Sequence, residues 1–222
     1  MNSFSKIKGW CFDLHGVIAD SWLYHEMAWH QIADKVGVTW TADLAEQLKG
    51  RDRMDSLTTI LASGQAENQF SDSEKQQLAN EKNDLYLQML ERMNPSDILP
   101  GVADFLADLK RNEYKMIIAS ASQNAPLEIK KLQLESYFDQ IVDVTKLKHN
   151  KPAPDVFQKA AEMLNLDVTE CIGLDDGIVG VQSINAAGMY SVGVGDAKVL
   201  HEANQIIPST SELTLERIKE QF

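Results

Sequence analysis

Three carboxylates in this sequence stand where an apolar segment stops. Asp13 follows one such segment, and the adjacent pair Asp175 and Asp176 follows another. Ligands of open parallel sheets bind beyond the carboxyl ends of the strands, so the three side chains are expected to meet there. Hard oxygen ligands suit Mg²⁺, and an aspartate can serve as a nucleophile. The alternative is that these acids only cap turns or remain solvated at the surface.

Two further groups could handle a phosphate. The stretch Ser120 to Asn124 follows a second apolar segment and precedes a helical pattern, so its hydroxyl groups and backbone amides could bind an anion. Lys151, followed by two prolines, could neutralise charge during phosphoryl transfer. The alternatives are that the serines and Asn124 only cap a helix and that Lys151 is a solvated loop residue.

Short apolar segments rich in Ile or Val are expected to be the strands that position these groups. They span residues 7–12, 115–119, 140–142, 171–174 and 191–194. Helical patterns lie between or after them, at 102–111, 126–132, 155–164, 180–187 and 198–203. The alternation predicts an α/β fold with a parallel sheet and helices on both of its faces.

Residues 21–93 interrupt this alternation. They contain several helical stretches, among them a long polar one at 72–93, and no convincing strand, over a span too long for a loop. We therefore expect an inserted helical cap domain at 21–93 and a core domain formed by residues 1–20 and 94–222.

The composition excludes some classes of partner. The 222 residues carry a net charge of −12, so we expect neither nucleic acid nor an anionic membrane as a partner. No apolar run approaches membrane-spanning length and the N-terminus lacks the apolar core of a secretory signal, which favours a cytoplasmic location. We expect a monomer. Cys11 and Cys171 lie within apolar segments and are expected to be buried free thiols.

Four motifs in this order resemble those of the haloacid dehalogenase superfamily: FDLHGVIAD, IIASAS, the lysine of KPAPD, and GLDDG. The resemblance to the beta-phosphoglucomutase family extends along nearly the whole chain and includes YHEMAWHQIAD, QLKGRDRMDSL, ASASQN, KPAPDVF and TLERIKE. It implies a Rossmann-like parallel-sheet core and a helical cap that enclose a small phosphorylated sugar between them.

The resemblance also implies roles for the strand-end residues. Asp13 would attack the phosphoryl group and become an aspartyl phosphate. The cofactor Mg²⁺ would be bound by the carboxylate of Asp13, the backbone carbonyl of His15 and the carboxylate of Asp176, with Asp175 assisting.

The remaining roles concern the substrate. Ser120 and Lys151 would hold the transferring phosphate, while Arg53 and Lys49 would hold a second phosphate. Arg53 could instead be only an exposed helix residue. The full set of implied substrate-binding residues is His25, Lys49, Gly50, Arg53, Ser56, Lys82, Ser120, Ala121, Ser122 and Asn124.

The sequence departs from the family pattern at three positions. The family has a second aspartate two residues after the nucleophile, as general acid and base, where this chain has His15. Imidazole can shuttle protons, with an unperturbed pKa near ~6.5, but it is larger than a carboxylate and its cation is disfavoured beside Mg²⁺. Gly177 replaces a serine, and Gln123 replaces a lysine that helps to hold phosphate.

The expected function is phosphotransfer of the beta-phosphoglucomutase type, which interconverts beta-glucose 1-phosphate and glucose 6-phosphate through an aspartyl phosphate and a bisphosphate intermediate. Whether His15 impairs catalysis stays open. If it does, His15→Asp would raise the turnover of the sugar phosphate. The alternatives are a Mg²⁺-dependent sugar-phosphate phosphatase and a non-catalytic phosphosugar-binding relative.

Overall fold

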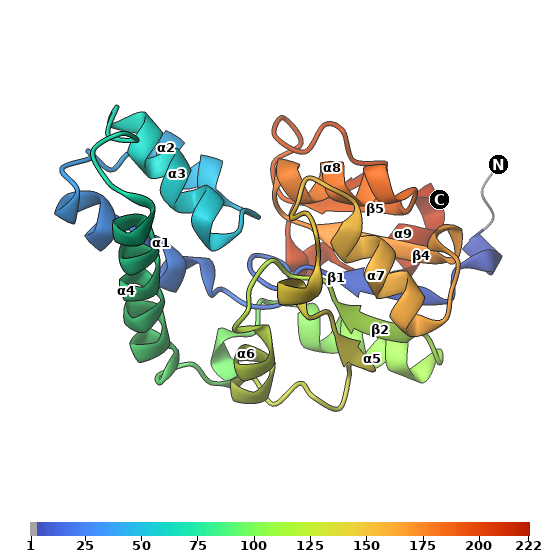
Figure 1. The fold of residues 1–222 in the computed structure, drawn as a ribbon. Coiled ribbons are helices and arrows are strands. Elements are labelled where there is room, and N and C mark those ends of the chain that lie inside the picture. The colour runs from blue at the N-terminus through green and yellow to red at the C-terminus, as the bar shows by residue number, and fades with distance from the viewer. Residues whose placement is uncertain (1–3) are drawn as a thin grey trace.

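A parallel six-stranded sheet is the centre of the fold in residues 4–222, the part of the chain that this computed structural model describes. The strands are β1 (Gly9–Phe12), β2 (Lys115–Ile118), β3 (Gln140–Ile141), β4 (Cys171–Asp175), β5 (Tyr190–Val194) and β6 (Gln205–Ile207). Their order is β3-β2-β1-β4-β5-β6 (Figure 1). This is the order of Rossmann-type sheets, so the predicted α/β fold is confirmed.

Helices lie on both faces of the sheet and form a separate group beside it (Figure 1). Their bounds are α1 (Trp22–Lys35), α2 (Ala42–Leu48), α3 (Arg53–Ser63), α4 (Asp72–Leu90), α5 (Val102–Arg111), α6 (Ala125–Lys131), α7 (Asp155–Leu164), α8 (Ile178–Ala187) and α9 (Leu215–Gln221). The predicted helices at 102–111 and 155–164 coincide with α5 and α7.

Successive side chains of β1 enter different hydrophobic clusters. Cys11 packs with Phe157 of α7 and Ile184 of α8. Trp10 lies on the opposite face, where its ring meets that of Phe105 of α5 edge to face at 5.4 Å. Alternating side chains point to opposite faces, and both faces are covered, which is why the strands are apolar throughout. Both cysteines are buried and free, as predicted.

Helices α1 to α4 have a hydrophobic cluster of their own, which includes Trp29, Ile32, Leu57, Ile60 and Leu78. Helix α4 packs against α1 and α3, and α2 packs against α3. Figure 1 shows this group at the left, on the opposite side of the sheet from both chain ends. Residues 21–93 contain no strand, as predicted. The domain limits drawn from the sequence stay a prediction.

The C-terminal part of the sheet differs from the prediction. The helix expected at 198–203 is wrong, because that segment consists of separate turns. Two of these turns are closed by the amides of Val199 and Leu200, which both donate to the carbonyl of Asp196. Leu200 is instead buried against Gly193 of β5. The short strand β6 was not predicted.

Every helix within residues 4–222 is too short or too polar to cross a lipid bilayer.

Candidate active site

The paired strands β1 and β4 bring Asp13 and Asp175 together at one edge of the sheet. Phe12 and Leu174 lie opposite each other in the parallel register, and the amide of Asp13 donates to the carbonyl of Leu174 at 2.9 Å. Strands β2 and β3 follow on one side of β1, and the later strands β4, β5 and β6 lie on its other side. Such a reversal of strand order leaves a crevice at the carboxyl ends of the strands, where ligands bind.

Lys151 bridges the two strand-end carboxylates. Its Nζ donates to Asp13 Oδ1 at 2.7 Å and to Asp175 Oδ2 at 2.8 Å, and all three residues are buried. Burial alone would lower the pKa of Lys151, but the charges of the two carboxylates outweigh it and raise that pKa. The lysine predicted to hold a phosphate therefore also fixes the carboxylate predicted to attack it.

A third carboxylate completes an acidic cluster. Asp13, Asp175 and Asp176 each offer an oxygen, and these atoms lie within 4.8 Å of one another. Burial, followed by the charges of Asp175 and Asp13, raises the pKa of Asp176 to about 8. Three carboxylates face one ammonium group, so a divalent cation would relieve the excess negative charge. An all-oxygen donor set is what a hard cation requires, and these residues could hold a metal ion.

Two glycines allow the carboxylates to approach the backbone. A Cβ on Gly16, whose φ is +74°, would lie 2.0 Å from Asp176 Oδ2, and a Cβ on Gly180 would lie 1.8 Å from Asp175 Oδ2. Real side chains do not come that close, so a larger residue at either position would displace the neighbouring carboxylate. Neither glycine was predicted to belong to the site, although both follow the acidic residues within a few positions.

The loop after β2 links the core to the helical group. The amide of Ser122 donates to Ser120 Oγ at 3.2 Å, and the amide of Asn124 donates to Ser122 Oγ at 3.1 Å. The Asn124 side chain donates to Asn83 Oδ1 of α4 at 3.0 Å, and the same oxygen accepts from Arg53 Nη2 at 2.7 Å. Arg53 is therefore held in place through Asn83, a residue that the sequence analysis missed.

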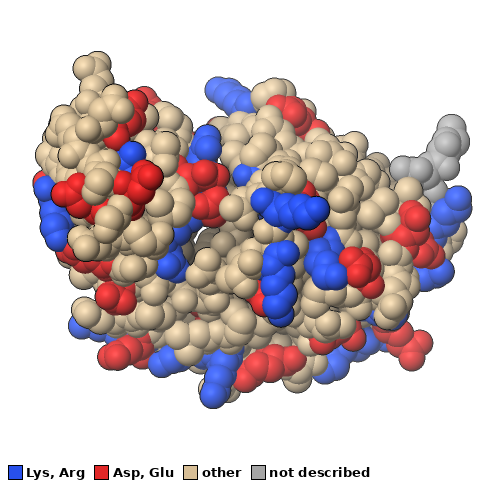
Figure 2. Space-filling model, in the orientation of Figure 1, with Lys and Arg blue, Asp and Glu red and all other residues tan. Residues whose placement is uncertain are grey.

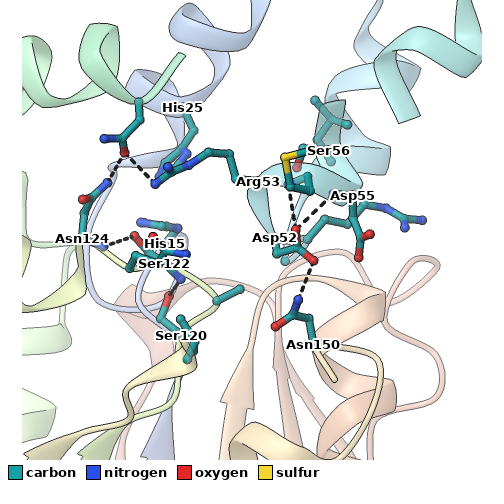
Figure 3. Close-up of a pocket in the computed structure, with 18 of the residues that line it drawn as sticks. His15, His25, Asp52, Arg53, Asp55, Ser56, Ser120, Ser122, Asn124 and Asn150 are labelled. Atoms are coloured by element: carbon teal, nitrogen blue, oxygen red, sulfur yellow. Dashed lines mark hydrogen bonds between the residues drawn. The ribbon is translucent and has the colours of Figure 1, made fainter. Parts of the chain in front are cut away.

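A cavity of about 620 Å³ separates the helical group from the sheet edge. Figure 2 shows the corresponding hollow in the surface, and Figure 3 shows Arg53 and Ser56 on the helical side with Ser120 and Ser122 on the core side. The cavity is lined by these predicted site residues: Asp13, His15, His25, Lys49, Gly50, Arg53, Ser56, Lys82, Ser120, Ala121, Ser122, Asn124 and Asp176. Lys151 and Asp175 are buried and are absent from this lining.

Lys82 and His25 form a close pair on the helical side of the cavity. Lys82 Nζ lies 2.6 Å from His25 Nδ1 and is nearly buried between the rings of Trp29 and Tyr86. Burial lowers the pKa of Lys82 to about 7. Burial and the charge of Lys82 also lower the pKa of His25 well below its ordinary value. An anion in the cavity would stabilise the protonated form of Lys82.

His15 has a carboxylate partner that the sequence analysis missed. Its Nε2 lies 3.0 Å from Oε2 and 3.3 Å from Oε1 of Glu128, a fully buried residue of α6. Burial would lower the pKa of His15, but the charge of Glu128 and its hydrogen bond outweigh it and raise that pKa. The available signal was a carboxylate in an apolar helical stretch, next to Ile129 and close to Leu132.

His15, His25 and Glu128 also offer ligand atoms within 4.8 Å of one another. His25 Nδ1 already contacts Lys82 Nζ at 2.6 Å, and His15 Nε2 is hydrogen-bonded to Glu128. We therefore interpret the three residues as a hydrogen-bonding cluster.

One more contact joins the helical group to the core. Asp52 begins α3 by accepting from the amides of Met54 and Asp55, and its Oδ2 accepts from Asn150 Nδ2 at 2.8 Å (Figure 3). Lys49, expected to hold a second phosphate, is paired with Glu46 Oε2 at 2.9 Å in this structure.

Comparison with known proteins agrees with this geometry. A family model described as haloacid dehalogenase-like hydrolase matches residues 7–188. The beta-phosphoglucomutase of Bacillus subtilis is 39% identical over 216 residues, which cover 97% of this chain and 96% of the relative. The crystal structure of a beta-phosphoglucomutase from Clostridium difficile superposes with a TM-score of 0.93 at 42% identity and covers 97% and 96% of the two chains. A fructose-1-phosphate phosphatase of Escherichia coli is 28% identical over 194 residues, 86% of this chain and 98% of its own.

Proposed function

Because this chain belongs to the haloacid dehalogenase-like hydrolase family and matches beta-phosphoglucomutases over nearly its whole length, we propose that it interconverts beta-glucose 1-phosphate and glucose 6-phosphate. One observation carries this proposal beyond the family. The cavity has Asp13, held by Lys151, on its core side and the basic residues Arg53 and Lys82 on its helical side. A sugar with a phosphate at each end would have a partner for both phosphates.

Asp13 is the proposed nucleophile. Lys151 holds its Oδ1, while Oδ2 has no hydrogen-bond donor among residues 4–222 and is free to attack phosphorus. The new bond makes an aspartyl phosphate as the bond from phosphorus to the sugar oxygen breaks. Ser120 and Lys151 would contact the phosphoryl oxygens, where charge is concentrated during transfer.

The cofactor we propose is Mg²⁺. It would be held by the carboxylates of Asp13 and Asp176 and the backbone carbonyl of His15, with Asp175 assisting. When bound, Mg²⁺ neutralises the charge of the carboxylates and of the transferring phosphate.

We propose that residues 21–93 act as a cap over a core formed by residues 1–20 and 94–222. The distal phosphate and the sugar would contact the cap residues His25, Lys49, Gly50, Arg53, Ser56 and Lys82 and the core residues Ala121, Ser122 and Asn124. A cap that closes over the sugar expels water from the aspartyl phosphate, which favours transfer to a sugar hydroxyl over hydrolysis.

Hydrolysis is the second candidate, because the fructose-1-phosphate phosphatase of Escherichia coli is also similar over 86% of this chain. In that reaction water, in place of a sugar hydroxyl, would take the phosphoryl group from Asp13.

Phosphorus NMR distinguishes the two reactions. The protein is mixed with beta-glucose 1-phosphate, Mg²⁺ and a catalytic amount of glucose 1,6-bisphosphate, with Asp13→Asn as the control. We expect glucose 6-phosphate with the wild-type protein and none with the variant. Release of inorganic phosphate as the main product would replace the mutase by the phosphatase. Binding of the sugar phosphate without either product would indicate a non-catalytic phosphosugar-binding protein.

A further inference from the structure

The contact between His15 and the buried Glu128 has no role in the function proposed so far. We propose that Glu128 is a positioning residue: it holds Nε2 of His15, so that Nδ1 gives a proton to, and takes one from, the sugar oxygen during phosphoryl transfer. This inference rests on the proposed mutase reaction, for which it supplies the missing general acid and base.

The geometry leaves one ring nitrogen for the substrate. Nε2 lies within hydrogen-bonding distance of both carboxylate oxygens of Glu128, at 3.0 and 3.3 Å. Nδ1 has no hydrogen-bond partner among residues 4–222, and the His15 side chain, 16% exposed, lines the cavity. His15 also follows the proposed nucleophile Asp13 by two residues. The free nitrogen is therefore in the part of the cavity where phosphoryl transfer is proposed.

The carboxylate itself is held in place. Glu128 is completely buried on α6, and its Oε1 accepts a second hydrogen bond from Ser122 Oγ at 3.2 Å. Ser122 Oγ in turn accepts from the amide of Asn124. A carboxylate fixed from two directions fixes the plane of the imidazole that it contacts, as do the carboxylates that orient catalytic histidines elsewhere.

The contact also selects the protonation pattern of the ring. A carboxylate can only accept, so the Nε2 proton stays on the ring in both charge states. Nδ1 then carries a proton in the cationic ring and has a free lone pair in the neutral ring. These are the two forms that an acid and a base require at the same atom.

The proton balance closes over the reaction. As Asp13 bonds to phosphorus, the phosphorus–oxygen bond to the sugar breaks, and the departing oxygen takes the Nδ1 proton. His15 is then neutral. In the return step, another sugar hydroxyl attacks the aspartyl phosphate and gives its proton to Nδ1, while the bond from phosphorus to Asp13 breaks. The enzyme ends with the protons with which it began.

Substrates with different leaving groups separate positioning from a purely structural role. Glu128→Leu removes the contact, and Ile129→Val, which alters the adjacent buried residue of α6, is the matched control for packing. We expect Glu128→Leu to lower kcat for beta-glucose 1-phosphate by about 10²-fold, within the range for a lost proton-transfer group. The first-turnover release of p-nitrophenolate from p-nitrophenyl phosphate, which reports only the attack of Asp13 and whose leaving group needs no acid, should slow less than about threefold. Equal losses on both substrates, or an unchanged kcat for the sugar, would overturn the proposal.

The tautomer of His15 gives a test that does not need turnover. Nitrogen-15 NMR of histidine-labelled protein, with the His15 signals identified by their loss in His15→Gln, should show the neutral ring protonated on Nε2. Glu128→Leu should produce a mixture of tautomers, while Ile129→Val should not. A neutral ring protonated on Nδ1 in the wild-type protein would overturn the role of Glu128. Absence of sugar turnover in the wild-type protein would overturn the mutase reaction, and the tautomer would still decide whether Glu128 positions the ring.

Discussion

Lys82 Nζ lies 2.6 Å from His25 Nδ1, and no carboxylate within residues 4–222 forms an ion pair with this lysine. Burial lowers its pKa to about 7, so at pH 8 the ammonium form is the minor one. A phosphate dianion beside Lys82 would raise that pKa again. The binding of a sugar phosphate should therefore be coupled to a proton.

We predict that glucose 6-phosphate binding at pH 8, with saturating Mg²⁺, takes up protons. Calorimetry in two buffers of different ionisation enthalpy measures the number of protons taken up per bound glucose 6-phosphate. Lys82→Met should bind more weakly and abolish most of the uptake, because the phosphate itself is already a dianion at pH 8, well above its second pKa of ~6. Uptake of the same size in Lys82→Met would contradict this prediction.

The metal-free protein should bind Mg²⁺ more tightly as the pH rises. The pKa of Asp176 is raised to about 8, so below that pH its carboxyl group must lose a proton before it can coordinate. Affinity should increase between pH 6.5 and 8 and protons should be released, as measured by calorimetry. Asp176→Asn should remove both effects, whereas the exposed control Asp104→Asn should keep them. A pH-independent affinity in the wild-type protein would argue against this site.

Gly180→Ala should damage the site, while Gly177→Ala should be tolerated. A Cβ at Gly180 would meet the Asp175 carboxylate at 1.8 Å, but at Gly177 the nearest atom lies 3.5 Å away. Displacing Asp175 also disturbs its bond to Lys151, so we expect a loss of about 1–3 kcal/mol in the free energy of unfolding for Gly180→Ala. Urea denaturation of both variants measures the difference, and similar stabilities would refute the argument.

His15→Asp should lower sugar-phosphate turnover, in contrast to the gain expected from the sequence if His15 impairs the enzyme. The new carboxylate would face buried Glu128 and replace an ion pair by a like-charge contact. The double variant His15→Asp/Glu128→Leu removes this repulsion and should recover activity relative to the single variant. Phosphorus NMR of glucose 6-phosphate formation compares them. A single variant more active than the wild type would show that the histidine impairs the enzyme.

Arg53→Ala should affect substrates with two phosphates most. Arg53 lines the cavity from α3 and donates a hydrogen bond to Asn83. We expect KM for the bisphosphate to rise at least about tenfold, the effect of losing ~1.4 kcal/mol of binding. The rate with p-nitrophenyl phosphate, which has no second phosphate, should change little. Equal losses on the two substrates would exclude a distal phosphate site at Arg53.

The sequence by itself predicted the sheet and the residues at its edge. Asp13, Asp175 and Asp176 could be placed together because parallel strands end at a common edge, whatever the details of packing. Helices α5 and α7 could be bounded because each has a continuous apolar stripe. The segment 198–203 has no such apolar stripe. Its residue Leu200 packs against β5, and the segment forms turns and no helix.

Only the tertiary structure decided the partners of the site residues. Glu128 is 113 positions from His15, and Asn150 is 98 positions from Asp52, so neither contact leaves a periodic signal in the local sequence. The sequence does not show whether a given Glu or Asp will be buried or solvated. Buried and solvated carboxylates differ in desolvation and in the charges beside them. For Glu128, both properties are set when α6 packs beside the loop after β1, which carries His15. The role of His15 is therefore a property of the folded chain, because its partner comes from another element.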